Sequence, residues 1–152
     1  MINNFLPNVA VVGAGPGGLT LARVLQLQGI EATVFERDSS PTFRPQGGTL
    51  DLHPDSGQLA LRHAGLTEKF QAVARYEDQG SRLYDHHGVL HHAETGGEGD
   101  RPEVDRTDLR RLLLDSLHLD TIHWNSAVSA IEKLPGGRFE VVLSDGTKSS
   151  SA

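Results

Sequence analysis

The chain has 152 residues and a formal net charge of −6, from 14 lysines and arginines against 20 acidic side chains. This acidic balance argues against nucleic-acid binding, because phosphate contacts need a basic face. Cysteine is absent, which excludes disulfides and thiolate metal sites. No apolar run approaches transmembrane length, and the N-terminus lacks the basic and apolar regions of a signal peptide. We therefore expect a cytoplasmic protein that does not bind membranes.

The first predicted element is an apolar strand at Val9–Val12, which runs directly into Gly13-Ala-Gly-Pro-Gly-Gly18. Its unbroken apolar character is typical of a fully buried parallel strand. A helix is predicted over 19–28, ended by Gly29, and a second strand over 32–35. Strand, Gly-x-Gly-x-x-Gly turn and helix in this order are the dinucleotide-binding fingerprint at the start of a βαβ unit.

Each glycine of the fingerprint has a physical role. Gly13 permits the tight turn, Gly15 lets a pyrophosphate approach the backbone, and Gly18 lets the helix pack closely on the strand. The unpaired N–H groups of the first helical turn, together with the helix dipole, favour an anion. We therefore predict that these glycines bind the diphosphate of a dinucleotide.

The second strand ends in Glu36-Arg37. Glu36 lies 18 residues after Gly18, close to the spacing at which an acidic side chain meets a ribose hydroxyl. We interpret it as the ribose ligand, the alternative being a solvated charge at a strand end. Arg37 either contacts the nucleotide or belongs to the surface.

Turn residues and hydrophobic spacing predict the remaining elements. These are a loop over 38–48, a strand over 49–53, short helices over 55–64 and 67–73, a β-hairpin over 81–93, a polar loop over 94–102, a helix capped by Thr107 that carries Leu109, Leu112, Leu113 and Leu117, and strands over 122–124, 127–134 and 139–143. The pattern indicates an α/β fold with a parallel sheet and inserted β-hairpins.

Neither a metal site nor a catalytic side chain is predicted. His86, His87, His91 and His92 lie in or beside the hairpin, but adjacent strand residues point to opposite faces, so at most half could converge on one ion. No acid–base or nucleophile motif is present. That absence is expected where a cofactor performs the chemistry.

Further motifs extend the fingerprint into a longer pattern. They are Glu36-Arg-Asp38, Gly47-Gly-Thr-Leu-Asp-Leu-His53, Ser56-Gly-Gln58, Ala64-Gly-Leu66, Pro102-Glu103, Arg106-x-Asp-Leu-Arg110 and Leu114-x-Ser-Leu117. With the glycine turn, they resemble the class A flavin-dependent monooxygenases of the p-hydroxybenzoate hydroxylase fold. More narrowly, they are similar to the Tet(X)-type tetracycline-inactivating monooxygenases. The resemblance covers nearly the whole chain.

The resemblance implies a role for each matching residue in binding FAD. The three fingerprint glycines correspond to the diphosphate turn and Glu36 to the ribose contact. Asp51 and Arg106 correspond to FAD-contacting residues, and Arg44 to an arginine near the flavin that is implicated with the nicotinamide cofactor. The simpler alternatives are a solvent-facing strand edge for Asp51, surface ion pairs with Asp105 or Asp108 for Arg106, and a solvated side chain for Arg44.

The resemblance also implies an architecture and an activity. Residues 1–152 are expected to be the N-terminal part of a Rossmann-like FAD-binding domain in a longer, monomeric enzyme. That enzyme would use FAD and NADPH to hydroxylate a tetracycline-like or other polycyclic aromatic small molecule through a flavin hydroperoxide, a reaction connected with antibiotic resistance. The 152 residues alone are expected to be inactive and to bind FAD weakly or not at all.

Two other functions remain open at this point. One is an NAD(P)-dependent dehydrogenase domain, although residues 47–53 and 106–110 have no place in that plan. The other is a non-catalytic dinucleotide-binding module.

Overall fold

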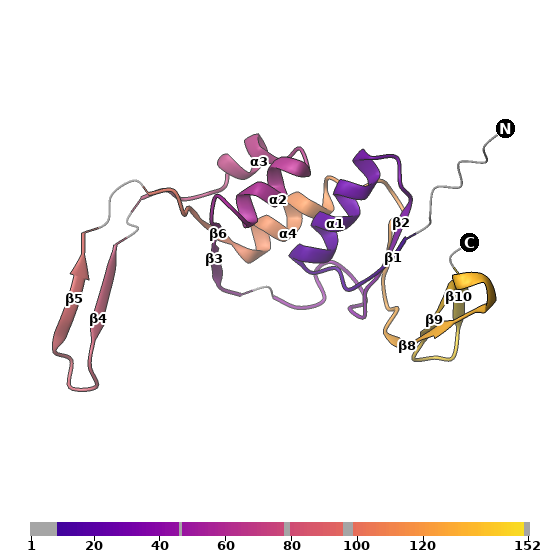
Figure 1. The fold of residues 1–152 in the computed structure, drawn as a ribbon. Coiled ribbons are helices and arrows are strands. Elements are labelled where there is room, and N and C mark those ends of the chain that lie inside the picture. Colours follow the sequence, from indigo (N-terminus) through magenta and orange to yellow (C-terminus); the bar gives the residue numbers. More distant parts are fainter. Residues whose placement is uncertain (1–8, 46, 78–79, 96–98, 151–152) are drawn as a thin grey trace. The chain divides into compact units, whose positions relative to one another are not determined.

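The computed structural model describes residues 9–45, 47–77, 80–95 and 99–150 (Figure 1). The chain forms two compact units, one built from the chain before Gly47 and from Arg110 onward, the other from Gly47 to Leu109. The N-terminal segment and part of the predicted 94–102 loop lie outside the described residues. None of the described helices has the length and apolar character needed to cross a bilayer.

A parallel sheet with one crossover helix organises the first unit (Figure 1). Its elements are β1 (Val9–Val12), α1 (Pro16–Leu27), β2 (Ala32–Phe35) and β7 (Ile122–His123), with the strands in the order β1-β2-β7. Both strand pairs are parallel, and α1 packs against β1 and β2. Val11 and Val34 of the strands and Leu19 and Ala22 of the helix are all buried. The predicted βαβ unit is therefore confirmed.

Two details of this unit differ from the sequence prediction. Helix α1 begins at Pro16 rather than at residue 19, because proline suits the first helical position, where no N–H partner is needed. Strand β1 is not fully buried: Val12 is 55% exposed, since β1 is the edge of the described sheet and Val12 faces a pocket. The predicted helix end is confirmed, because Gly29 has φ +72° and the Ile30 N–H donates to the Leu25 carbonyl at 3.0 Å.

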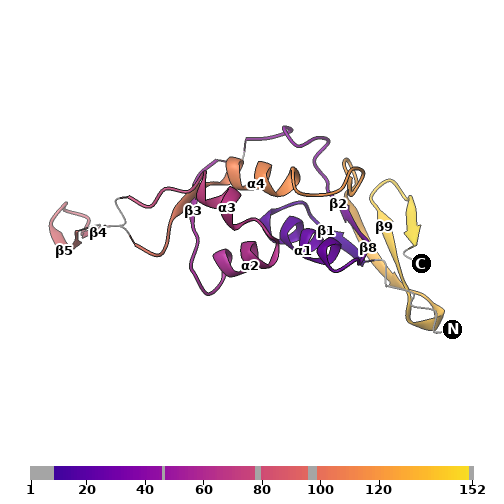
Figure 2. The same ribbon diagram turned by 90° about the horizontal axis from the view of Figure 1, so that it is seen from above.

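The first unit also contains an antiparallel sheet of β8 (Val128–Lys133), β9 (Phe139–Leu143) and β10 (Lys148–Ser150), with β9 in the middle. Figure 2 shows β8 and β9 side by side. The β8–β9 hairpin was predicted, but β10 was not, because Lys148-Ser-Ser lacks an apolar alternation. The Lys148 ammonium lies between Glu132 (2.8 Å) and Glu140 (2.9 Å), and these hydrogen bonds raise the pKa of Lys148.

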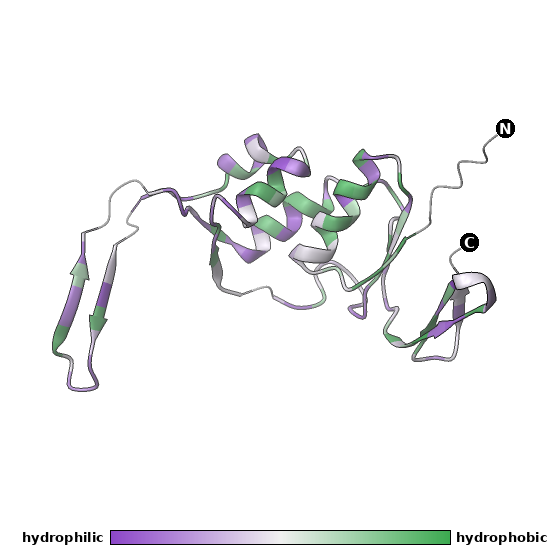
Figure 3. Cartoon of the chain, in the orientation of Figure 1, coloured by the Kyte–Doolittle hydropathy of each residue, from purple (hydrophilic) through white to green (hydrophobic). Residues whose placement is uncertain are grey.

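The second unit combines short helices with two pairs of strands. Its elements are β3 (Thr49–Asp51), α2 (Gly57–His63), α3 (Thr67–Gln71), β4 (Ser81–Tyr84), β5 (Leu90–Glu94) and β6 (Glu103–Asp105). Strands β4 and β5 form the predicted hairpin, with Gly88 at φ +79° in its turn. Apolar and polar residues mix along this hairpin (Figure 3), and Leu83 and Tyr84 are exposed.

Strand β6 was not predicted, because three residues carry almost no periodicity. It pairs antiparallel with β3, and Arg75 holds it from the other side. The Arg75 backbone exchanges two hydrogen bonds with Glu103 (2.8 and 2.9 Å), and its guanidinium pairs with Asp105 at 2.9 Å. Contacts with β3 and with Arg75, which are distant in sequence, therefore stabilise this segment as a strand.

Helix α4 (Arg106–Leu114) follows β6 without a loop. The prediction that Thr107 caps this helix is wrong, because the helix already begins at Arg106. Three residues of the predicted apolar face, Leu109, Leu112 and Leu113, are buried, whereas Leu117 lies beyond the end of the helix and is half-buried.

Candidate cofactor-binding site

The glycine turn after β1 has a geometry that other residues could not adopt. Gly13 has φ +97°, and its N–H donates to the Phe35 carbonyl at 2.8 Å. A Cβ on Gly18 would lie 2.1 Å from the Gly13 carbonyl oxygen and 3.3 Å from Val11 Cγ1. These two glycines therefore let α1 start in close contact with β1.

Gly15 differs from Gly13 and Gly18 because the protein itself does not require glycine there. Its φ of −80° is open to any residue, and a Cβ would meet no atom within 4 Å. The space above this backbone is therefore open to a ligand.

Backbone donors line the start of α1. Pro16 occupies the first helical position, and the Leu19 N–H is bonded to the Gly15 carbonyl at 3.0 Å. Among the described residues, no acceptor pairs with the N–H groups of Gly15, Gly17 or Gly18. Unpaired donors at a helix N-terminus favour an anionic ligand.

The turn borders a pocket of about 350 Å³, a volume typical of small-molecule sites. Five of the residues predicted from the sequence meet there, namely Gly13, Gly15, Glu36, Arg37 and Arg44. The rest of the lining comes from Val12, Phe35 and residues 126–128.

Glu36 is buried at the end of β2, with 6% of its surface exposed. Its Oε2 accepts the Ala14 N–H at 2.6 Å and its Oε1 accepts the Asp38 N–H at 3.0 Å. It is therefore not the solvated charge of the alternative interpretation. A carboxylate has about four lone-pair directions, so two remain for a hydroxyl donor from the pocket.

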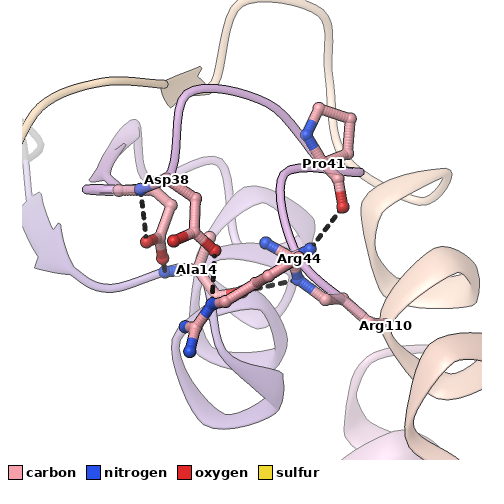
Figure 4. Close-up of polar contacts among 6 residues, drawn as sticks. Ala14, Asp38, Pro41, Arg44 and Arg110 are labelled. Carbon is pink, nitrogen blue, oxygen red and sulfur yellow. Dashed lines mark hydrogen bonds and ion pairs between the residues drawn. The ribbon is translucent and has the colours of Figure 1, made fainter. Parts of the chain in front are cut away.

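Two arginines border the same pocket. Arg44 Nε donates to Asp38 Oδ2 at 3.0 Å (Figure 4), and Asp38 is itself buried. This hydrogen bond, with the charge of Asp38, raises the pKa of Arg44. Half of the Arg44 side chain remains exposed, so its guanidinium is anchored yet accessible. Arg37 is exposed, and within the described part of the chain it forms no ion pair.

Arg110 is a component that the sequence prediction did not assign. It is 4% exposed, and it donates from Nε to the Ala14 carbonyl (3.3 Å) and from Nη1 to the Pro41 carbonyl (2.6 Å) (Figure 4). Its Cζ lies 5.6 Å from the centre of the Trp124 ring. A charge on the apolar face of the helix, one residue from Leu109, was the signal that could have found it.

Asp51 and Arg106 lie in the second unit. Asp51 is the last residue of β3, is exposed, and lies opposite Glu103 in the register of the β3–β6 strand pair. The Arg106 N–H donates to the Gly48 carbonyl at 3.1 Å, whereas its exposed side chain forms no ion pair with any described residue. Asp105 pairs with Arg75 instead, so the surface ion pair considered for Arg106 is not formed. Contact of Asp51 and Arg106 with FAD stays a prediction.

Comparison with known proteins identifies the ligand class of this domain. The sequence model of a family described as FAD binding domain matches residues 7–145. The chain belongs to this FAD binding domain family. That membership favours FAD over the nicotinamide dinucleotide of the dehydrogenase alternative.

Relatives of this FAD binding domain include monooxygenases. The monooxygenase asqM of Emericella nidulans is 38% identical over 125 residues, covering 79% of this chain and 28% of that protein. The monooxygenase penA of Penicillium thymicola is 35% identical over 151 residues, covering 94% of this chain and 34% of that protein. The chain thus spans about a third of the length of these relatives.

Solved structures share the fold. The crystal structure of tetracycline destructase Tet(51) superimposes with a TM-score of 0.70 at 24% identity, covering 97% of this chain and 37% of that one. The predicted fold class, an FAD-binding α/β domain with a parallel sheet and β-hairpins, is confirmed. A particular closeness to the Tet(X) type stays a prediction.

Proposed function

We propose that residues 1–152 belong to the FAD-binding domain of a flavin-dependent monooxygenase. The observation that carries this proposal is the convergence of the glycine turn, Glu36 and two arginines on one pocket. The family match and the monooxygenase relatives support it. When bound, FAD supplies redox chemistry that amino-acid side chains do not provide.

The residues present fit the nucleotide end of FAD. The N–H groups of Gly15, Gly17 and Gly18 donate to the diphosphate, and the helix dipole adds favourable charge. Glu36 accepts a ribose hydroxyl with its free lone pairs. Arg37 and Arg44 offset the negative charge at the pocket rim. Asp51 and Arg106 also contact FAD, as the resemblance implies.

The proposal also includes the identity of the reductant and of the substrate. We infer that NADPH reduces the enzyme and that Arg44, anchored by Asp38, contacts the nicotinamide cofactor. The substrate is a tetracycline-like or other polycyclic aromatic molecule. The shared fold with a tetracycline destructase supports this substrate class, and the monooxygenase relatives support the type of reaction. The enzyme works as a cytoplasmic monomer.

The test uses the protein expressed over the full length of its natural reading frame, called the full-length protein below. We expect one FAD per chain, oxidation of NADPH with uptake of O₂, and loss of tetracycline absorbance. FAD binding with NADPH oxidation but no change in tetracycline would contradict only the substrate class. A protein that does not bind FAD would contradict the central proposal.

A further inference from the structure

Arg110 is a buried charge with neutral partners. Burying a guanidinium is costly unless hydrogen bonds compensate it. Yet within the described residues Arg110 pairs with no carboxylate, and both of its hydrogen-bond acceptors shown in Figure 4 are backbone carbonyls, those of Ala14 and Pro41. The Trp124 ring covers it at 5.6 Å. An arginine on the surface would avoid this desolvation cost. We therefore expect the hydrogen bonds of Arg110 to the two carbonyls to have a function.

The Ala14 carbonyl belongs to the peptide group that joins Ala14 to Gly15. All described peptide bonds are trans, and in a planar trans peptide the C=O and the N–H point in opposite directions. Because Arg110 holds the carbonyl, the Gly15 N–H points away from Arg110. Gly15 lines the pocket, and its N–H has no acceptor among the described residues.

The preceding peptide group is fixed by the opposite charge. Its N–H, that of Ala14, donates to Glu36 Oε2 at 2.6 Å. Two successive peptide groups of the turn are therefore held, one by a buried carboxylate and the other by a buried guanidinium. Through Pro41, Arg110 also anchors the loop between Asp38 and Arg44, which carries the arginine at the pocket rim.

We propose that Arg110 is a positioning residue for diphosphate binding: it fixes the Ala14–Gly15 peptide so that the Gly15 N–H is presented to the diphosphate. This inference rests on the proposed function, because it takes FAD to occupy the pocket. Arg110 itself does not touch the ligand. Its contribution is to prevent this peptide from rotating, which would turn a carbonyl oxygen toward the phosphates.

The test compares ligands with and without the diphosphate. FAD, ADP and adenosine are titrated by calorimetry into the full-length protein, and into its Arg110→Met, Arg110→Lys and Arg111→Gln variants. Arg110→Met keeps much of the volume and removes every donor. Arg110→Lys keeps the charge and can hold one carbonyl. Arg111→Gln alters the exposed arginine next to it on α4.

We expect Arg110→Met to weaken FAD and ADP binding by about tenfold or more, with little change for adenosine. Arg110→Lys should recover part of that loss, and Arg111→Gln should match the wild type. If Arg110→Met does not fold, the test is the ratio of ADP affinity to adenosine affinity in Arg110→Lys. A ratio below that of the wild type supports the inference, and an unchanged ratio overturns it. Equal weakening of all three ligands, or none, would overturn the inference while leaving FAD binding by the wild type intact. No FAD binding by the wild type would overturn both.

Discussion

The Ala14 N–H donates a 2.6 Å hydrogen bond to Glu36 Oε2, which links the glycine turn to the end of β2 across 22 residues of sequence. The second carboxylate oxygen accepts the Asp38 N–H at 3.0 Å. One side chain thus orders the turn and the start of the following loop, and its remaining lone pairs stay available to the pocket.

The Glu36→Gln variant tests both functions of this carboxylate. Glutamine has a single side-chain acceptor oxygen, so one of the two backbone N–H groups would face an amide donor. We expect the free energy of unfolding to fall by about 1–3 kcal/mol, and the FAD affinity to fall about tenfold or more. Glu31→Gln is the matched control, because Glu31 is exposed and, among the described residues, its side chain forms no hydrogen bond while its carbonyl accepts the Val9 N–H. Unchanged FAD affinity in Glu36→Gln would argue against the ribose contact.

Gly18→Ala should destabilise the fold. The new Cβ would lie 2.1 Å from the Gly13 carbonyl oxygen, and backbone cannot yield as a flexible side chain does. We expect a loss of about 1–3 kcal/mol in urea unfolding of the FAD-free protein. Gly17→Ala, where the Cβ meets open space, should gain about 0.5–1 kcal/mol. Equal stability of the two variants would show that α1 does not approach β1 this closely.

The glycine turn and Glu36 were predictable because the signal is local. Backbone conformation at Gly13 and close packing at Gly18 depend on residues within one turn of chain, and the strand end places Glu36 near the turn. Arg110 was not predictable in the same way, since its acceptor on Ala14 lies 96 residues away. The same holds for residues 126–128, which reach the pocket through the pairing of β7 with β2 and through the hydrogen bond from the Ser126 N–H to the Glu36 carbonyl.

Short strands set a second limit on prediction from sequence. Strands β6 and β10 have three residues each, too few to show a period of two. Arg75 and Glu103 define the first, and Lys148 with its two glutamates stabilises the second. The long elements α1, α4 and the hairpins were predicted because their apolar spacing or their turn glycines repeat over enough residues.

Arg106→Ala should weaken FAD binding without affecting the fold. The Arg106 side chain is exposed and has no ion-pair partner among the described residues, so we expect the free energy of unfolding to change by less than about 0.5 kcal/mol. FAD affinity, measured by flavin fluorescence, should fall about tenfold or more. Arg111→Ala, also exposed and on the same helix, should change neither quantity. Identical FAD affinity in both variants would remove Arg106 from the site.

The turn of the β4–β5 hairpin should depend on pH through Asp85. Its Oδ1 accepts the His87 and Val89 N–H groups at 2.9 Å, and its Oδ2 lies 3.1 Å from His91 Nε2. The His91 hydrogen bond, followed by that of Val89, lowers the pKa of Asp85. This carboxylate therefore stabilises the hairpin fully above its ordinary pKa of about 3.9, and the contribution is lost as pH falls through the lowered pKa.

NMR titration of the His87 and Val89 amides measures this effect. We expect a midpoint below about 3.9 in the wild type, and a midpoint that rises toward 3.9 in His91→Gln. The adjacent His92→Gln variant should titrate like the wild type. A wild-type midpoint at the ordinary value would show that His91 does not contact Asp85 in solution.

The location of FAD is the central claim, and a crystal structure of the full-length protein with FAD tests it most directly. We predict diphosphate oxygens within about 3 Å of the Gly15, Gly17 and Gly18 nitrogens, and a ribose hydroxyl donating to Glu36. The Arg110–Ala14 hydrogen bond should persist in that complex. FAD bound elsewhere, with the glycine turn empty, would contradict the claim.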